Sequence, residues 1–146
     1  MANKDAAFGL KPIGKVGQNR DNQGLSEYDI AASATAIYFN DPVKMKNDGT
    51  IEVAGAGGAI LGSINGVFFT DATTSKPTFA NHLNASNTAT DIVGFISDDP
   101  YERFEIQTNN TGASAKTDIF NVADIEYTAG SSPDFVSAVE LNDSTL

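Results

Sequence analysis

The chain has no cysteine and no tryptophan, and it has a single histidine among 146 residues. The absence of cysteine excludes disulfides, thiolate metal sites and thiol nucleophiles together. Stability must therefore come from packing and hydrogen bonding. Association with other copies is a further source, because a partner that binds only the folded form stabilises it.

Long apolar runs are also missing. The stretch Ala59-Ile60-Leu61 ends at Gly62, far short of the roughly 20 apolar residues that a membrane-spanning helix needs. The N-terminus carries Lys4 without a following apolar segment, which predicts that it is not a secretory signal. We therefore expect no membrane partner.

Positive charge is scarce and unevenly placed. The chain holds 9 basic and 19 acidic residues, for a net charge of −10. The first 20 residues carry four basic residues against Asp5 alone, so the rest of the chain is strongly acidic. An acidic body repels phosphate backbones, which predicts no nucleic-acid partner. The charge indicates either simple solubility or a basic segment that docks on an acidic partner.

The first 25 residues differ in composition from the remainder. Five glycine and proline residues and a polar run over residues 18–23 disfavour a helix or a long strand. We predict an extended N-terminal arm over residues 1–25 and a body over residues 26–146. The apolar residues of the arm are isolated, which suits a ribbon on a surface, although a free tail is the alternative. They are Phe8, Leu10, Ile13 and Val16.

The body reads as short strands separated by turns. Residues 43–53 predict a hairpin with Val43, Met45, Ile51 and Val53 on its buried face. Residues 60–69 predict a second hairpin that turns at Asn65-Gly66, and residues 71–90 a long polar excursion. Further strands are expected within residues 26–30, 36–39, 92–96, 103–107, 119–127 and 137–141. No helical periodicity persists, so the predicted fold class is all-β, a small β-barrel or sandwich with an extended N-terminal arm.

Candidate chemistry is sparse. His82 has no second histidine or cysteine with which to bind zinc, and no G-x-S-x-G motif marks a nucleophilic serine. The densest acidic cluster combines Asp98 and Asp99 with Glu102 and Glu105. Adjacent acids in an Asp-Asp-Pro turn point in different directions, unlike the paired acids of a hydrolase. A calcium ion at Asp98 and Asp99 stays open, and otherwise we predict no cofactor, no metal and no enzymatic activity.

Four segments carry a resemblance to a known group of proteins. Residues 28–31, 37–43, 51–54 and 60–66 read Tyr-Asp-Ile-Ala, Ile-Tyr-Phe-Asn-Asp-Pro-Val, Ile-Glu-Val-Ala and Ile-Leu-Gly-Ser-Ile-Asn-Gly. This order resembles small structural proteins of tailed bacteriophages, in which an Asp-Pro-Val turn and an Ile-Leu-Gly-x-x-x-Gly strand recur. Residues 98–107 and 137–141 and the opening twelve residues are similar to virion proteins of marine phages.

The resemblance implies a β-barrel body, often a homotrimer, whose N-terminal arm lies on the capsid shell. It implies a capsid decoration (cement) protein on the outer surface of the virion, with the major capsid protein as partner. A head-fibre, tail or neck component is the alternative within this class. The arm residues expected to contact the capsid are Phe8, Leu10, Lys11, Ile13, Lys15 and Val16.

A carbohydrate-binding module for host adhesion is the competing function. Such modules stack aromatic side chains on sugars, and the chain has no tryptophan for this purpose. Tyr101, Phe79 and Tyr127 are the residues that could replace it.

Overall fold

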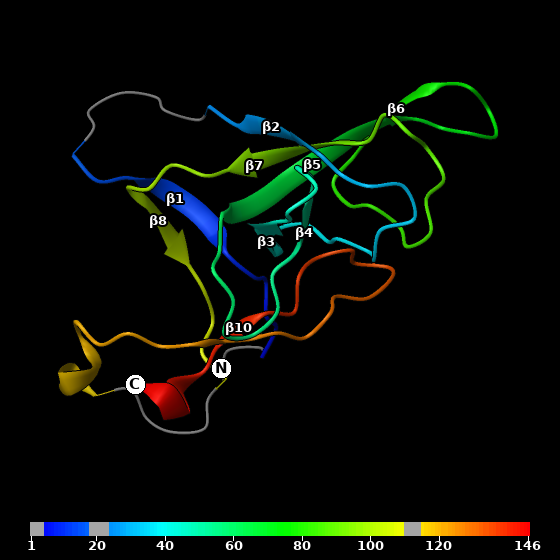
Figure 1. The fold of residues 1–146 in the computed structure, drawn as a ribbon. Coiled ribbons are helices and arrows are strands. Elements are labelled where there is room, and N and C mark those ends of the chain that lie inside the picture. The colour runs from blue at the N-terminus through cyan, green and yellow to red at the C-terminus, as the bar shows by residue number, and fades with distance from the viewer. Residues whose placement is uncertain (1–4, 18–23, 110–114) are drawn as a thin grey trace.

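The strands of this chain are short and are joined by long irregular segments (Figure 1). The computed structural model describes residues 5–17, 24–109 and 115–146. Within them lie ten strands and two 3₁₀ turns. They are β1 (Lys11–Lys15), β2 (Ser26–Asp29), β3 (Pro42–Met45), β4 (Ile51–Val53), β5 (Gly62–Thr70), β6 (Pro77–Ala80), β7 (Val93–Ser97), β8 (Glu102–Glu105), η1 (Lys116–Asp118), β9 (Ile125–Glu126), β10 (Glu140–Leu141) and η2 (Asp143–Thr145).

β5 is the hub of the largest sheet. The strand order is β2-β7-β5-β3-β4, and β6 also pairs with β5. One edge of β5 pairs with β7, whereas the other edge pairs with β3 at its start and with β6 from Val67 to Thr70. All strand pairings in the three described sheets are antiparallel, so the all-β prediction is confirmed.

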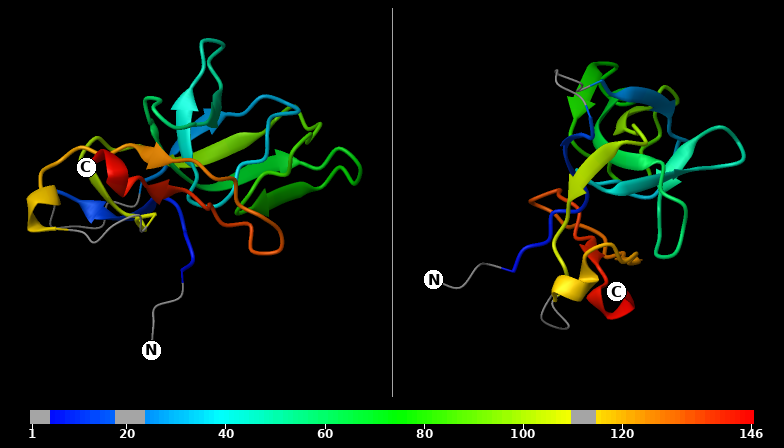
Figure 2. Two further views of the ribbon diagram at one scale, coloured as in Figure 1. Left: turned by 90° about the horizontal axis from the view of Figure 1, so that it is seen from below. Right: turned by 90° about the vertical axis from the view of Figure 1, so that its left-hand side faces the viewer.

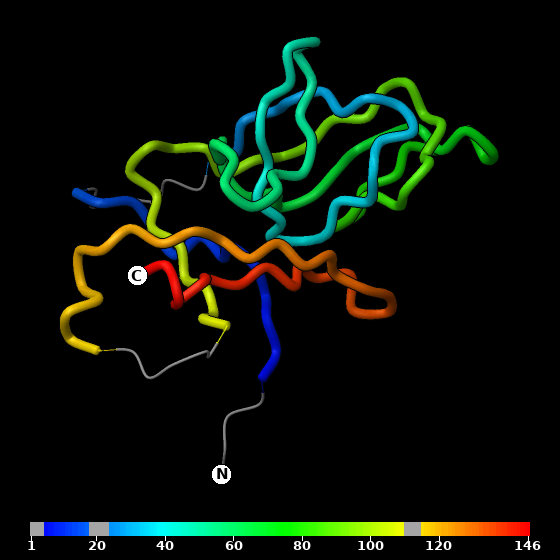
Figure 3. Tube along the Cα trace, turned by 60° about the horizontal axis from the view of Figure 1, so that its bottom comes forward, coloured from blue at the N-terminus to red at the C-terminus, as the bar shows by residue number. Residues whose placement is uncertain are grey.

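The large sheet curls until its two outer strands approach each other. Ile30, which follows β2, forms an isolated parallel bridge with Ile51 of β4. One bridge does not make a continuous ladder, so the described residues form a curled sheet and not a closed barrel. The two-stranded sheets β1-β8 and β10-β9 lie outside the large sheet, on the side where the described chain ends (Figures 1 and 3).

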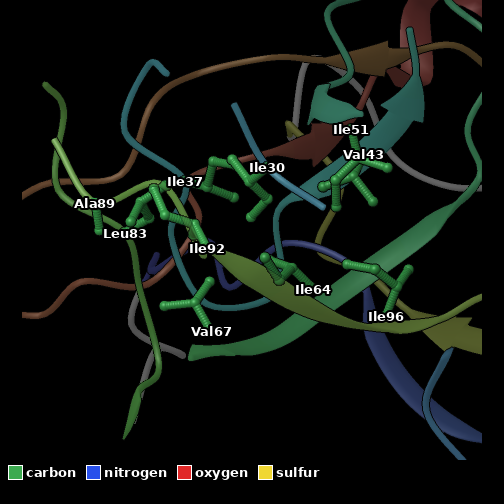
Figure 4. Packing of buried hydrophobic residues seen from close by; sticks show 10 residues of the cluster. All are labelled: Ile30, Ile37, Val43, Ile51, Ile64, Val67, Leu83, Ala89, Ile92 and Ile96. Carbon is green, nitrogen blue, oxygen red and sulfur yellow. The ribbon is translucent and has the colours of Figure 1, made fainter. Parts of the chain in front are cut away.

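The hydrophobic core fills the inside of the curled sheet (Figure 4). Isoleucine and valine dominate it, because branched side chains pack well on a pleated surface. Full burial of one such side chain contributes roughly 1.5–3 kcal/mol. The core residues are Ile30, Ile37, Val43, Ile51, Ile64, Val67, Leu83, Ala89, Ile92 and Ile96.

The predicted turn at Asn65-Gly66 is wrong. β5 runs through it as one strand of nine residues, and the register against β7 shifts between Ile64 and Gly66. Asn65 is therefore an extra residue in β5, accommodated as a β-bulge. An Asn-Gly pair is compatible with a turn. Here a continuous strand is more stable, because it lets Ile64 and Val67 pack in the core while β5 pairs with β7 and β6. The predicted polar excursion over residues 71–90 is also corrected, because β6 lies within it.

The hairpin predicted over residues 43–53 is confirmed, with one correction. Val43 pairs with Val53, and Met45 pairs with Ile51. Val43 and Ile51 are buried, but Met45 is 68% exposed. Its strand β3 pairs with β5 only at Pro42 and Val43, so the tip of the hairpin extends beyond the sheet and nothing covers Met45 there.

Candidate functional site

Three of the predicted docking residues, Lys11, Ile13 and Lys15, lie in β1, which pairs with β8 as a two-stranded ribbon. The ladder pairs Lys11 with Glu105 and Lys15 with Glu102, and its register shifts between Pro12 and Gly14. Ile13 is the extra residue at this bulge. Gly14 has a φ of +136°, a conformation that favours glycine, and its N–H donates to Glu102 Oε1 at 2.9 Å. The bulge thus turns Ile13 away from the ladder.

Large apolar side chains remain exposed at this ribbon. Ile13 and Val16 are each more than half exposed, and Tyr101 is 71% exposed. The Val16 N–H donates to the carbonyl of Tyr101 at 3.0 Å, which places these two residues across the strand pair from each other. We call Ile13, Val16 and Tyr101 the ribbon patch.

Both lysines of the ribbon are paired within the chain. Lys11 Nζ lies 3.1 Å from Glu105 Oε2 at an exposed position. Lys15 Nζ lies 2.9 Å from Asp99 Oδ2. The hydrogen bond from Lys15, followed by the one from the Tyr101 N–H, lowers the pKa of Asp99 below its ordinary value. Lys4 and Arg20, the other basic residues of the predicted arm, lie outside the described residues.

Residues 8–10 are fixed to the body by Asn40. Its side-chain amide donates to the Phe8 carbonyl at 3.1 Å, and its own carbonyl accepts from the Leu10 N–H at 2.9 Å. Leu10 is buried and Phe8 is half-buried. In this conformation Leu10 therefore contributes to the core and is not available to a capsid, whereas Ile13 and Val16 are.

The two adjacent aspartates predicted as an acidic cluster at the end of β7 bind different groups of the protein. Asp98 accepts hydrogen bonds from the hydroxyls of Ser26 and Tyr28 at 2.8 and 2.6 Å. Asp99 pairs with Lys15. The two carboxylates therefore serve different partners. Within the described ranges, no group of three or more histidine, aspartate or glutamate side chains is placed to hold a metal ion.

His82 packs against an aromatic ring. Its imidazole stacks on Phe135 with 3.9 Å between ring centroids and 6° between planes. Its Nδ1 lies 2.8 Å from Asn81 Oδ1. Both contacts fix the ring in place on the surface of the body.

An aromatic row on the outer face of the large sheet was not predicted as a unit. The ring of Phe79 of β6 lies near the rings of Phe68 of β5 and Phe95 of β7, with centroid distances of 4.7 and 6.4 Å. Phe79 alone is 74% exposed. Predicting this row from the sequence would require the register between β5, β6 and β7, and no local sequence pattern gives that register. We call these three phenylalanines the aromatic face.

A second apolar segment follows η1. Phe120 is 99% exposed and Val122 is 88% exposed, and Ile119 is also exposed. The predicted strand over residues 119–127 is thus confined to Ile125–Glu126, of which Ile125 is buried. We call residues 119–122 the apolar turn.

Of the aromatic residues named for sugar binding, Tyr127 differs from the other two. It is half-buried, and burial followed by the charge of Asp41 raises its pKa to about 12. Tyr101 and Phe79 are exposed.

No protein-family model matches this chain, and no curated protein sequence or solved structure matches it either. None of its described helical segments has the length and apolar character of a membrane-spanning helix.

Proposed function

We propose that this chain is a non-enzymatic structural protein of a bacteriophage virion, a decoration protein that binds the outer surface of the capsid and stabilises it. The curled sheet would act as the small barrel-like body, and residues 1–25 as the arm that contacts the major capsid protein. The protein would act as a homotrimer. The resemblance in the sequence supports the assignment to phage structural proteins. The exposed ribbon patch supports the proposed contact with the capsid.

The ribbon patch is the observation that carries this proposal. Ile13 and Val16 belong to the predicted docking set, and each is more than half exposed on a strand pair held by a ladder and two ion pairs. A fixed ribbon presents its apolar side chains at little further cost in conformational entropy. It is therefore suited to an apolar contact with a shell.

The ion pairs of Lys11 and Lys15 reduce the electrostatic part of the proposed contact with the capsid. Lys11 and Lys15 already neutralise Glu105 and Asp99 within the chain. Attraction between these lysines and an acidic capsid would have to compete with those partners. We expect apolar contact to dominate, with binding that persists in about 0.5 M salt, where the Debye length is only a few ångströms.

The test is binding to capsids of the encoding phage from which the protein has been stripped. Wild-type protein should rebind and raise the temperature at which the heads open. The double substitution Ile13→Ser and Val16→Ser should weaken rebinding by about tenfold or more, which corresponds to about 1.4 kcal/mol. Met45→Ser is the matched control, because Met45 is an apolar residue that is also more than half exposed, on the hairpin tip.

The outcomes separate clearly. Antibody against the chain should label the outside of intact heads in electron micrographs. Label confined to tails or fibres would support the head-fibre, tail or neck alternative and overturn the capsid assignment. Equal rebinding by the double variant and by Met45→Ser would remove the ribbon patch from the contact.

The aromatic face favours a carbohydrate-binding module as the second candidate. Phe79 is exposed and flanked by two further rings, and flat aromatic surfaces stack on sugar rings. Glycan-array binding by wild type that is lost in Phe79→Ser would support this alternative. Absence of binding to any host glycan would count against it.

A further inference from the structure

The outer face of the large sheet carries an apolar surface with an acidic border. The register places Phe95 opposite Glu27 and Val93 opposite Asp29, so these two carboxylates of β2 share the face of the sheet with Phe95. Both carboxylates are exposed and have no ion pair among the described residues. The aromatic face is thus suited to a partner that presents an apolar side chain beside a cation.

The apolar turn has that chemistry. Phe120 is almost fully exposed and sits at a φ of +78°, so the backbone turns sharply and projects the ring. Lys116 lies four residues before it in η1, is exposed, and forms no ion pair with the described part of the chain. An aromatic ring with a nearby ammonium group complements three phenylalanines bordered by two carboxylates.

The two surfaces cannot meet within one copy. β6, which carries Phe79, and η1, which precedes Phe120, lie at opposite ends of the molecule (Figures 1 and 2). Each therefore needs another molecule to cover it. A contact between two different surfaces of identical chains is heterologous, and it closes into a ring or continues as a filament.

We propose that the apolar turn of one copy seats on the aromatic face of the next. Phe120 packs against Phe79, and Lys116 lies beside Glu27 and Asp29 of the neighbouring copy. Three such contacts close the ring. This proposal deepens the homotrimer of the proposed function by naming its contact, and it does not depend on capsid binding.

The first test is the mass of the free protein by light scattering. Wild type at about 100 μM should form trimers, since even weak contacts populate complexes at that concentration. Phe120→Ser and Phe79→Ser should each be monomeric, whereas Met45→Ser, a change at an exposed apolar residue elsewhere, should remain trimeric. Circular dichroism and melting curves verify that each variant is folded. The pair Glu27→Lys and Asp29→Lys is a second way to disable the aromatic face, and it leaves Phe79 intact.

The decisive test mixes the two monomeric variants. Phe120→Ser retains an intact aromatic face and Phe79→Ser retains an intact apolar turn. A head-to-tail contact therefore predicts heterodimers on mixing, with one intact contact and no ring. A mixture that stays monomeric overturns the proposal, and so does a wild-type protein that is monomeric throughout. Capsid rebinding is measured separately, so failure here leaves the ribbon patch to be judged by its own variants.

Discussion

Lys15 Nζ lies 2.9 Å from Asp99 Oδ2, with the two side chains only 13% and 27% exposed. The contact joins β1 to the turn between β7 and β8, and so ties the N-terminal segment to the body. The other ion pair of the ribbon, Lys11–Glu105, is more than half exposed on both sides. Exposed ion pairs contribute little, so the two lysines should differ in effect.

Lys15→Gln should therefore weaken the ribbon more than Lys11→Gln does. Solvent screens the attraction between Lys15 and Asp99 less, because their side chains are largely covered. Replacing Lys15 also leaves the Asp99 carboxylate without its cationic partner. Amide hydrogen exchange in β1 is the measurement, with exchange in β7 of the same sample as the internal reference. Equal exchange in the two variants would contradict the assigned order.

The same pair predicts a dependence on acid. Lys15 lowers the pKa of Asp99 in the folded chain below the ordinary value of 3.8. The stabilisation is therefore complete above pH 3.8 and is lost as the pH falls through the lowered pKa. Protection of the β1 amides should decline below about pH 4. Asp99→Asn should already lack this protection at neutral pH and lose little more in acid.

Gly9→Ala should destabilise the protein much more than Gly17→Ala. Both glycines have positive φ, +71° and +78°, so both alanines carry a backbone strain of about 1–2 kcal/mol. A Cβ at Gly9 would also collide with the Asn40 carbonyl and with Ser137, whereas a Cβ at Gly17 meets nothing within 4 Å. Urea unfolding of the two variants gives the comparison. A similar loss in both would mean that residues 8–10 can move away from Asn40 at little cost.

Asn40→Asp should loosen the same anchor by a different route. The replacement keeps the size of the side chain but turns a donor toward the Phe8 carbonyl into an acceptor. This hydrogen bond is part-buried, so leaving the carbonyl unpaired costs at most about 1–3 kcal/mol. Limited proteolysis before residue 11 should accelerate in this variant. Unchanged cleavage would show that the Leu10–Asn40 backbone bond suffices.

Asp41→Asn should leave the protein at least as stable as wild type at pH 7. Burial raises the pKa of Asp41, so the folded state prefers the protonated acid, and stability falls as the pH rises from 3.8 through the raised pKa. An amide removes the buried charge and retains an oxygen for the Tyr38 N–H. Asp41→Ala should lose about 1–3 kcal/mol, because that N–H then lacks its acceptor. Chemical unfolding from pH 4 to pH 7 measures both effects.

Local patterns in the sequence sufficed where a strand and its partner are close along the chain. The hairpin over residues 43–53 is such a case. Alternation fixed the faces of Val43 and Ile51, but exposure of Met45 depends on where the neighbouring β5 stops pairing. The point at which β5 stops pairing with β3 is set by the tertiary structure, so the hairpin sequence alone does not reveal it.

The candidate surfaces show the same division. The spaced apolar residues of the arm identified Ile13 and Val16, yet Leu10 has the same local character and is buried. What separates them is Asn40, some 30 residues away, which holds the chain at Leu10 and leaves it free to bulge at Ile13. The aromatic face likewise depends on pairing between three strands.

The bulge at Asn65 decides which aromatic residues the sheet presents. Ile64 and Val67 are three residues apart and yet both are buried, because the extra residue shifts the alternation of β5 by one. Phe68 consequently lies outside, next to Phe79. Removing the single codon for Asn65 would remove the bulge and leave only Gly66 between Ile64 and Val67, so strict alternation would keep Val67 inward and Phe68 outward. The bulge thus holds one spare residue of β5, and evolution can lose it at this position without exchanging the two faces of the strand.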